Sequence, residues 1–90
     1  MAKTMLNIGN DYKVNADSIA AIMPYSGARI KNTIQYKRQQ DNENPDGTFV
    51  DATYGKKTLS VILCDDGQYI LSSVAPKTLA KRFSAIGNSR

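Results

Sequence analysis

Two adjacent lysines follow a glycine in the segment Asp51-Ala52-Thr53-Tyr54-Gly55-Lys56-Lys57-Thr58. Neighbouring side chains of a straight strand point to opposite faces. A turn after the glycine would let both ammonium groups reach one polyanion, and exposed backbone N–H groups would add donors to phosphate. Because lysine is a point charge without a bidentate fork, Lys56 and Lys57 predict salt-dependent affinity for phosphate rather than readout of bases.

This motif is weak by itself, because paired lysines after a glycine are common. A solvated hairpin tip is the more frequent explanation. The glycine spacing of a P-loop, G-x-x-x-x-G-K-[ST], is absent. Tyr54 could stack on a base or a sugar, but a single aromatic residue beside a turn is more often part of the packing.

The charges are segregated along the chain, whose net charge is +4. Residues 29–38 carry four cations and no acid, residues 41–51 carry four acids and no base, and no acid follows Asp66. Cations grouped on particular elements suggest a polyanionic partner. Ordinary solvated helix faces explain the grouping equally well. Within the first basic group, Arg29, Lys31 and Arg38 are candidate phosphate contacts.

The composition argues against several classes of site. The chain has no histidine, which removes the commonest general base and metal ligand. Its one cysteine, Cys64, lies in an apolar run and is expected to be a small buried hydrophobe. No zinc spacing and no paired-carboxylate cleft can be assigned. We therefore predict no catalytic residue, no metal and no cofactor, and the chain is not expected to be an enzyme.

No apolar run approaches the roughly 18–20 residues that a membrane-spanning helix needs. The amino-terminal residues lack the apolar stretch of a signal peptide. A cytoplasmic protein without membrane contact is the resulting expectation. We expect one domain over residues 1–90, ordered from about 6 to 86.

Hydrophobic periodicity and turn residues predict strands, a helix, more strands and a second helix. The predicted fold class is therefore α+β, a small and mainly antiparallel β domain with two helices. The predicted elements are strands around the turn at 9–11, a strand covered on both sides at 18–24, a helix from Gly27 to Gln40 with Ser26 as N-cap, a flexible loop at 41–48, a central strand at 59–64, a hairpin turn at 65–68, a strand at 69–72, and a helix from Pro76 that stops at Gly87.

Several segments resemble the RemA family of bacterial regulators of extracellular matrix genes, in the same order from Leu6 to Phe83. The most specific segment is Asp51 to Thr58. The others are Leu6-Asn7-Ile8-Gly9, Val14-Asn15-Ala16, Ile70-Leu71-Ser72-Ser73-Val74, and Pro76 with Thr78, Leu79, Ala80, Arg82 and Phe83. The resemblance implies a LytTR-like fold and a ring-like homo-oligomer that binds double-stranded DNA. It also implies transcriptional activation of biofilm matrix genes without enzymatic activity.

The chain departs from the family pattern at four positions. The family has arginines where Lys56 and Lys57 stand, so the charge is kept and the bidentate fork is lost. The family has an arginine at the position of Ser18, which in this chain is preceded by Asp17. It has a proline at the position of Arg29, where this chain gains a cation. The resemblance therefore implies DNA binding by Lys56 and Lys57, offers Arg29 as a substitute contact, and gives Ser18 no such role.

Two functions follow from these patterns. The first is a DNA-binding transcriptional regulator that repeats its basic patch on a homo-oligomeric ring. The alternative is a protein-interaction or structural ring subunit without DNA binding, which the serine at position 18 favours. RNA binding is a weaker third option, because no glycine-aromatic RNA-binding segment is present.

Overall fold

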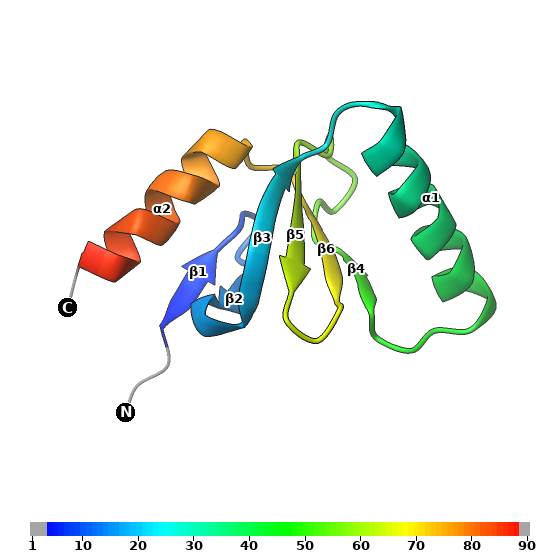
Figure 1. Cartoon of the computed structure of the whole chain (residues 1–90), viewed down its shortest axis with the longest axis horizontal. Coiled ribbons are helices and arrows are strands. Elements are labelled where there is room, and N and C mark those ends of the chain that lie inside the picture. Colours follow the sequence, from blue (N-terminus) through cyan, green and yellow to red (C-terminus); the bar gives the residue numbers. More distant parts are fainter. Residues whose placement is uncertain (1–3, 89–90) are drawn as a thin grey trace.

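A computed structural model of the chain describes residues 4–88, and the side chains up to residue 86. Figure 1 shows a central sheet with one helix at each end of the long axis. The elements in chain order are β1 (Met5–Asn7), β2 (Lys13–Asn15), a 3₁₀ turn (Ala16–Ser18), β3 (Ile19–Pro24), α1 (Ala28–Glu43), β4 (Phe49–Asp51), β5 (Ser60–Cys64), β6 (Tyr69–Ser72) and α2 (Pro76–Asn88).

The strands form a two-stranded sheet, β1-β2, and a four-stranded sheet with the order β3-β5-β6-β4. β5 pairs antiparallel with β3 and with β6, whereas β4 pairs parallel with β6. The predicted α+β class is therefore confirmed, with one parallel pair in a mainly antiparallel sheet. The predicted central strand and the hairpin turn that follows it are also confirmed.

Both faces of the central hairpin are buried, because apolar residues occupy both sides of the alternation. Val61 and Leu71 pack with Ile34 of α1 on one face. Ile62 and Ile70 pack on the other face, against the β1-β2 sheet and Leu79 of α2. Two small cores thus lie on opposite sides of one sheet.

The β1-β2 sheet is also joined to the central sheet by a buried hydroxyl. Oγ of Ser72 donates to the carbonyl oxygen of Ile8 at 2.6 Å, and Ser72 is fully buried. Gly9 follows with a φ of +103°, and a Cβ atom there would lie 2.8 Å from Cγ2 of Val74. Only glycine allows this approach of the β1-β2 turn to the chain after β6.

The first helix differs from its predicted bounds at both ends. Gly27, with a φ of +83°, takes the N-cap position and no side chain caps the helix, so the predicted role of Ser26 is wrong. The helix continues through Glu43, because no helix breaker precedes Pro45. The residue before a proline disfavours the α region, and Asn44 accordingly leaves the helical conformation, with a φ of −152° and a ψ of 79°. The predicted loop therefore shortens to residues 44–48.

Two other expectations need correction. The strand at Ile19–Pro24 is present, but it lies at an edge of the sheet and none of its residues is fully buried. Ile22 packs against one core and Met23 against the other, so the strand is covered only partly on its two sides. Gly87 does not stop the second helix, which extends to Asn88. Leu79 is the fully buried contact of that helix, whereas Phe83 remains partly exposed.

Candidate nucleic-acid interface

The paired lysines lie in the connection between β4 and β5, residues 52–59, which we call the lysine loop. It is not a hairpin tip, because β6 lies between β4 and β5 in the sheet. The loop crosses the end of β6 with two backbone hydrogen bonds. Ala52 N–H donates to the carbonyl of Leu71 at 3.0 Å, and Leu59 N–H donates to that of Ser72 at 2.9 Å. The loop is therefore attached to the sheet at both ends.

The base of the lysine loop is buried and hydrogen-bonded. Ala52 and Thr53 are 0% and 2% exposed. The Thr53 N–H and hydroxyl donate to Oδ1 of Asp51 at 3.0 and 2.5 Å. Nδ2 of Asn10, in the turn between β1 and β2, donates to the carbonyl oxygens of Ala52 and Thr53, each at 3.1 Å. Asp51, which directly precedes the base, and Asn10, from a distant turn, thus hold the base in place.

The carboxylate of Asp51 joins the loop to α1 as well. Its Oδ2 lies 3.4 Å from Nη1 of Arg38, whose guanidinium also stacks over the ring of Phe49. Partial burial alone would raise the pKa of Asp51, but the hydrogen bonds from Thr53 and the charge of Arg38 outweigh it and lower that pKa. Asp51 is therefore held in its charged form.

The tip of the lysine loop is a tight turn in which Tyr54 and Gly55 both have positive φ, 51° and 84°. The Lys56 N–H closes the turn with a 3.0 Å bond to the carbonyl of Thr53. The side chains of Lys56 and Lys57 are exposed. Neither forms an ion pair with a residue in the described part of the chain. A rigid base thus carries two exposed and uncompensated cations.

The three candidate cations of α1 have different surroundings. Arg29 is exposed. Nζ of Lys31 lies 5.7 Å from the ring centroid of Tyr25. Arg38 forms the ion pair with Asp51, which is the single ion pair among residues 4–86. Arg38 therefore has an intramolecular anionic partner, whereas Lys31 contacts only an aromatic ring and Arg29 forms no ion pair among these residues.

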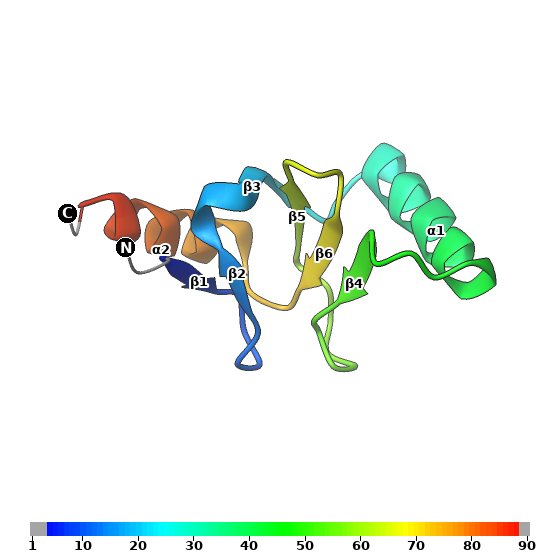
Figure 2. The same cartoon turned by 90° about the horizontal axis from the view of Figure 1, so that it is seen from below.

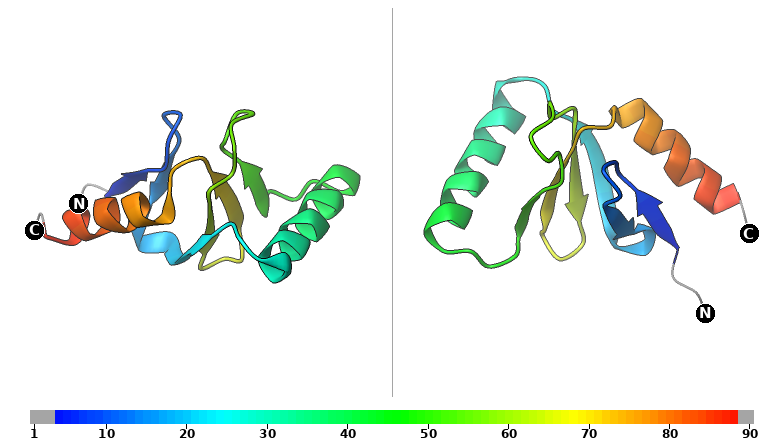
Figure 3. Two further views of the ribbon diagram at one scale, coloured as in Figure 1. Left: turned by 90° about the horizontal axis from the view of Figure 1, so that it is seen from above. Right: turned by 180° about the vertical axis from the view of Figure 1, so that it is seen from behind.

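Arg29 and Lys31, at the start of α1, do not form one patch with the lysine loop, whereas Arg38 contacts Asp51 at its base. Figure 2 shows the β1-β2 turn and the lysine loop projecting from the same side of the sheet, while α1 begins on the other side. The view from above in Figure 3 shows the same separation. Within one subunit, the structure brings Lys56 and Lys57 together and places Arg29 and Lys31 elsewhere.

Ser18, where the resemblance places an arginine, lies at the end of the sheet that carries the β5-β6 turn. Its carbonyl oxygen accepts the N–H of Asp65 at 2.8 Å. Asp17, Asp65 and Asp66 are exposed in these two segments. This end of the molecule is therefore acidic. That Ser18 contacts no phosphate stays a prediction.

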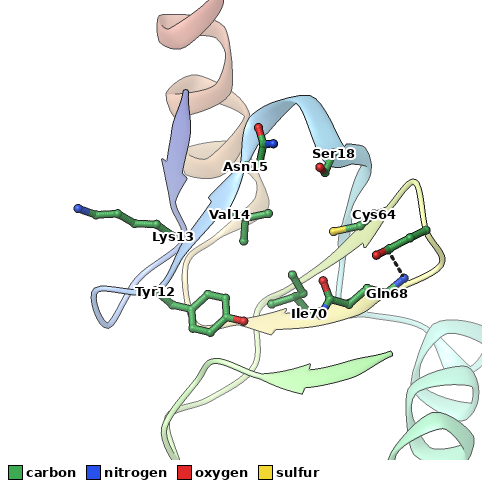
Figure 4. Close-up of a pocket in the computed structure, with 9 residues that line it drawn as sticks. Tyr12, Lys13, Val14, Asn15, Ser18, Cys64, Gln68 and Ile70 are labelled. Atoms are coloured by element: carbon green, nitrogen blue, oxygen red, sulfur yellow. Dashed lines mark hydrogen bonds between the residues drawn. The ribbon is translucent and has the colours of Figure 1, made fainter. Parts of the chain in front are cut away.

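Figure 4 shows a hollow of about 220 Å³ beside Ser18, between β2 and the β5-β6 hairpin. Cys64 lies in its wall and is 4% exposed, as predicted for a small buried hydrophobe. Burial, Asp66 and Asp65 all raise the pKa of the Cys64 thiol. The thiolate is thus disfavoured, which argues against a nucleophilic cysteine.

Two further features are absent from the part of the chain that the structure describes. Residues 4–88 contain no cluster of three or more histidine, cysteine or acidic side chains that could hold a metal ion. The same residues contain no helix with the length and apolar character needed to cross a membrane.

Comparison with known proteins identifies the family. The model of the family described as extracellular matrix regulatory protein A-like, or RemA-like, matches residues 5–83. The chain belongs to this RemA-like family. Its relatives include three proteins that carry the name "Putative regulatory protein", from Bacillus cytotoxicus, Bacillus mycoides and Bacillus cereus. Each is 42% identical over 84 residues, which cover 93% of this chain and 90% of the relative.

Membership in the RemA-like family confirms the resemblance seen in the sequence. The names of these relatives support a regulatory role, and none of them describes an enzyme. The α+β architecture agrees with the expected fold class, while its LytTR-like label stays a prediction.

Sequence reasoning missed two residues that shape the site, Asn10 and Asp51. The sequence does mark Asn10 as a turn residue, because it stands in Gly9-Asn10-Asp11 and asparagine tolerates positive φ. In the structure its φ is 54°. Nothing local shows that its amide reaches a loop more than 40 residues later in the chain.

Proposed function

We propose that this RemA-like chain is a transcriptional regulator that binds the phosphate backbone of double-stranded DNA through Lys56 and Lys57. The observation that carries the proposal is the lysine loop, with a buried, hydrogen-bonded base and two exposed cations that form no ion pair with any residue the structure describes. A rigid loop loses little conformational freedom on binding, so more of the electrostatic attraction appears as affinity.

A single subunit offers few cations on this side of the sheet, and each lysine contact to phosphate is weak and screened by salt. A homo-oligomeric ring would repeat the lysine loop along the DNA. Linked contacts then raise the effective concentration of each loop near the next phosphate. The ring and its target, genes for the extracellular matrix of biofilms, are what membership in the family suggests.

The cations of α1 enter the proposal differently. Arg29 and Lys31 lie at the start of α1, on the far side of the sheet from the lysine loop. DNA bound at the lysine loop of one subunit would therefore contact these residues only if it bends or if they belong to a neighbouring subunit. Arg38 neutralises Asp51 and positions the loop. We therefore assign the main phosphate contact to Lys56 and Lys57, and keep Arg29, Lys31 and Arg38 as secondary candidates.

A competing function is a structural or protein-interaction ring subunit without DNA binding. The acidic surroundings of Ser18 favour it, because Asp17 and Asp65 would repel phosphate at that end of the sheet. The two functions differ in one observable, the affinity for a duplex at low salt.

The test is a titration of fluorescently labelled duplex DNA with the full chain, read by fluorescence anisotropy at several salt concentrations, together with sedimentation velocity for the oligomeric state. The proposal predicts an oligomer whose affinity falls steeply with salt, because each neutralised phosphate releases counterions. An oligomer that leaves the duplex unbound at low salt would contradict DNA binding and support the competing function.

A further inference from the structure

Tyr54 is the most exposed large hydrophobic side chain of the described residues, at 66%. The sequence favoured a packing role for this tyrosine, and the structure shows that this interpretation is wrong. Its side chain forms no hydrogen bond to the rest of the described chain. The side chain therefore contributes little to folding, and its presence at the tip of the lysine loop calls for another explanation.

The backbone of Tyr54 adds to this argument. With φ values of 51° and 84° at Tyr54 and Gly55, and a 3.0 Å bond from Lys56 N–H to the Thr53 carbonyl, the tip has the pattern of a type I′ turn. The first central position of such a turn favours asparagine, aspartate or glycine. A tyrosine there is strained, because its Cβ crowds the following carbonyl oxygen. Neither packing nor turn chemistry explains the choice of residue.

What the position does provide is an aromatic ring two residues before a pair of uncompensated cations. Proteins that bind nucleic acids combine cations for phosphates with aromatic rings for non-ionic contacts to the nucleotide. In a duplex the base faces are stacked on one another, so the apolar surface beside a phosphate is the deoxyribose.

We propose that Tyr54 packs its ring against a deoxyribose of the bound duplex while Lys56 and Lys57 hold the adjacent phosphates. This inference rests on the proposed function and adds a non-ionic contact to it. The contribution of the ring is independent of salt, because no counterion is released when an uncharged group binds. The contributions of Tyr54 and of the lysines can therefore be separated by experiment.

The experiment compares Tyr54→Asn and Tyr54→Phe with the unmodified chain by fluorescence anisotropy on one duplex at several salt concentrations, and by urea unfolding. Tyr36, on α1, is 61% exposed and gives a matched control, Tyr36→Ala. We expect Tyr54→Asn to weaken DNA binding roughly five- to tenfold, which corresponds to the low end of the range for an aromatic ring stacked on a single-stranded base. The slope of affinity against salt should stay the same, and Tyr54→Phe should bind like the unmodified chain.

Stability distinguishes this contact from a structural role. Asparagine fits the turn better than tyrosine, so the unfolding midpoint of Tyr54→Asn should stay equal or rise. Unchanged DNA affinity in Tyr54→Asn, or a lower unfolding midpoint that accompanies weaker binding, would overturn the inference while DNA binding itself stands. A loss in Tyr36→Ala as large as in Tyr54→Asn would also overturn it. If the unmodified chain binds no DNA, the proposed function fails first and this contact fails with it.

Discussion

Nδ2 of Asn10 lies 3.1 Å from the carbonyl oxygen of Thr53, 43 residues away in the sequence. This hydrogen bond connects the small β1-β2 sheet to the base of the lysine loop. A second bond from the same amide to Ala52 has the same length. The position of the proposed DNA contact thus depends on the packing of two separate sheets.

Removing this amide should destabilise the chain. In Asn10→Gly the backbone keeps its freedom to adopt positive φ, but the carbonyl oxygen of Ala52 loses its donor and that of Thr53 keeps only the N–H of Lys56. We therefore expect a loss of about 1–3 kcal/mol in the free energy of unfolding. Asn10→Ala should lose about 1 kcal/mol more, because alanine is strained at positive φ. Urea unfolding measures both, and an Asn10→Gly variant as stable as the unmodified chain would show that the two hydrogen bonds contribute nothing.

Asp51 should make the stability depend on pH. Its pKa in the folded chain lies below the ordinary value of 3.8, so its charge contributes stability above that pH and the contribution is lost as the pH falls through the lower folded value. The difference in unfolding free energy between the unmodified chain and Asp51→Asn should therefore be largest near neutral pH and shrink below about pH 3.8. The pKa of Asp46 is also lowered. Because Asp46 is present in both proteins, its contribution cancels in the difference between their unfolding free energies. A difference that does not change with pH would contradict this role.

Arg38 should act mainly within its own subunit. Arg38→Ala removes an exposed ion pair and a stacking contact with Phe49, so the free energy of unfolding should fall by about 1 kcal/mol or less. The dependence of DNA affinity on salt should change little in anisotropy titrations. Arg29→Ala is the comparison, since it removes an exposed cation of the same helix that has no ion-pair partner among residues 4–86. An effect of Arg38→Ala on the salt dependence as large as that of removing both loop lysines would make Arg38 a direct phosphate contact.

Short sequence patterns predicted the hairpin turn and the central strand correctly, and they predicted the ends of α1 less well. Asp66-Gly67 predicted the β5-β6 hairpin, and the apolar residues on both faces of 59–64 predicted its central position. The end of α1 was missed by a few residues, because a chain of polar residues gives no stop until the proline at position 45. Its beginning was missed because Gly27 replaces a side-chain cap.

Long-range pairing could not be predicted in the same way. Nothing in Phe49–Asp51 shows that it pairs parallel with Tyr69–Ser72 rather than forming a hairpin with the strand that follows it. The lysine pair was correctly placed in an exposed loop. The exposure of Tyr54 and the contribution of Asn10 depend on that pairing, so they became visible only in the structure.

The most direct test of the account is the slope of log affinity against log salt for two double variants. Lys56→Ala with Lys57→Ala removes both loop cations, and Lys77→Ala with Lys81→Ala removes the same charge from exposed positions on α2. Each phosphate contact contributes about 0.9 to the slope, so the loop variant should bind more weakly with a clearly shallower slope. The α2 variant should stay close to the unmodified chain. Equal slopes in the loop variant and the unmodified chain would contradict the assignment of Lys56 and Lys57 as the DNA contact.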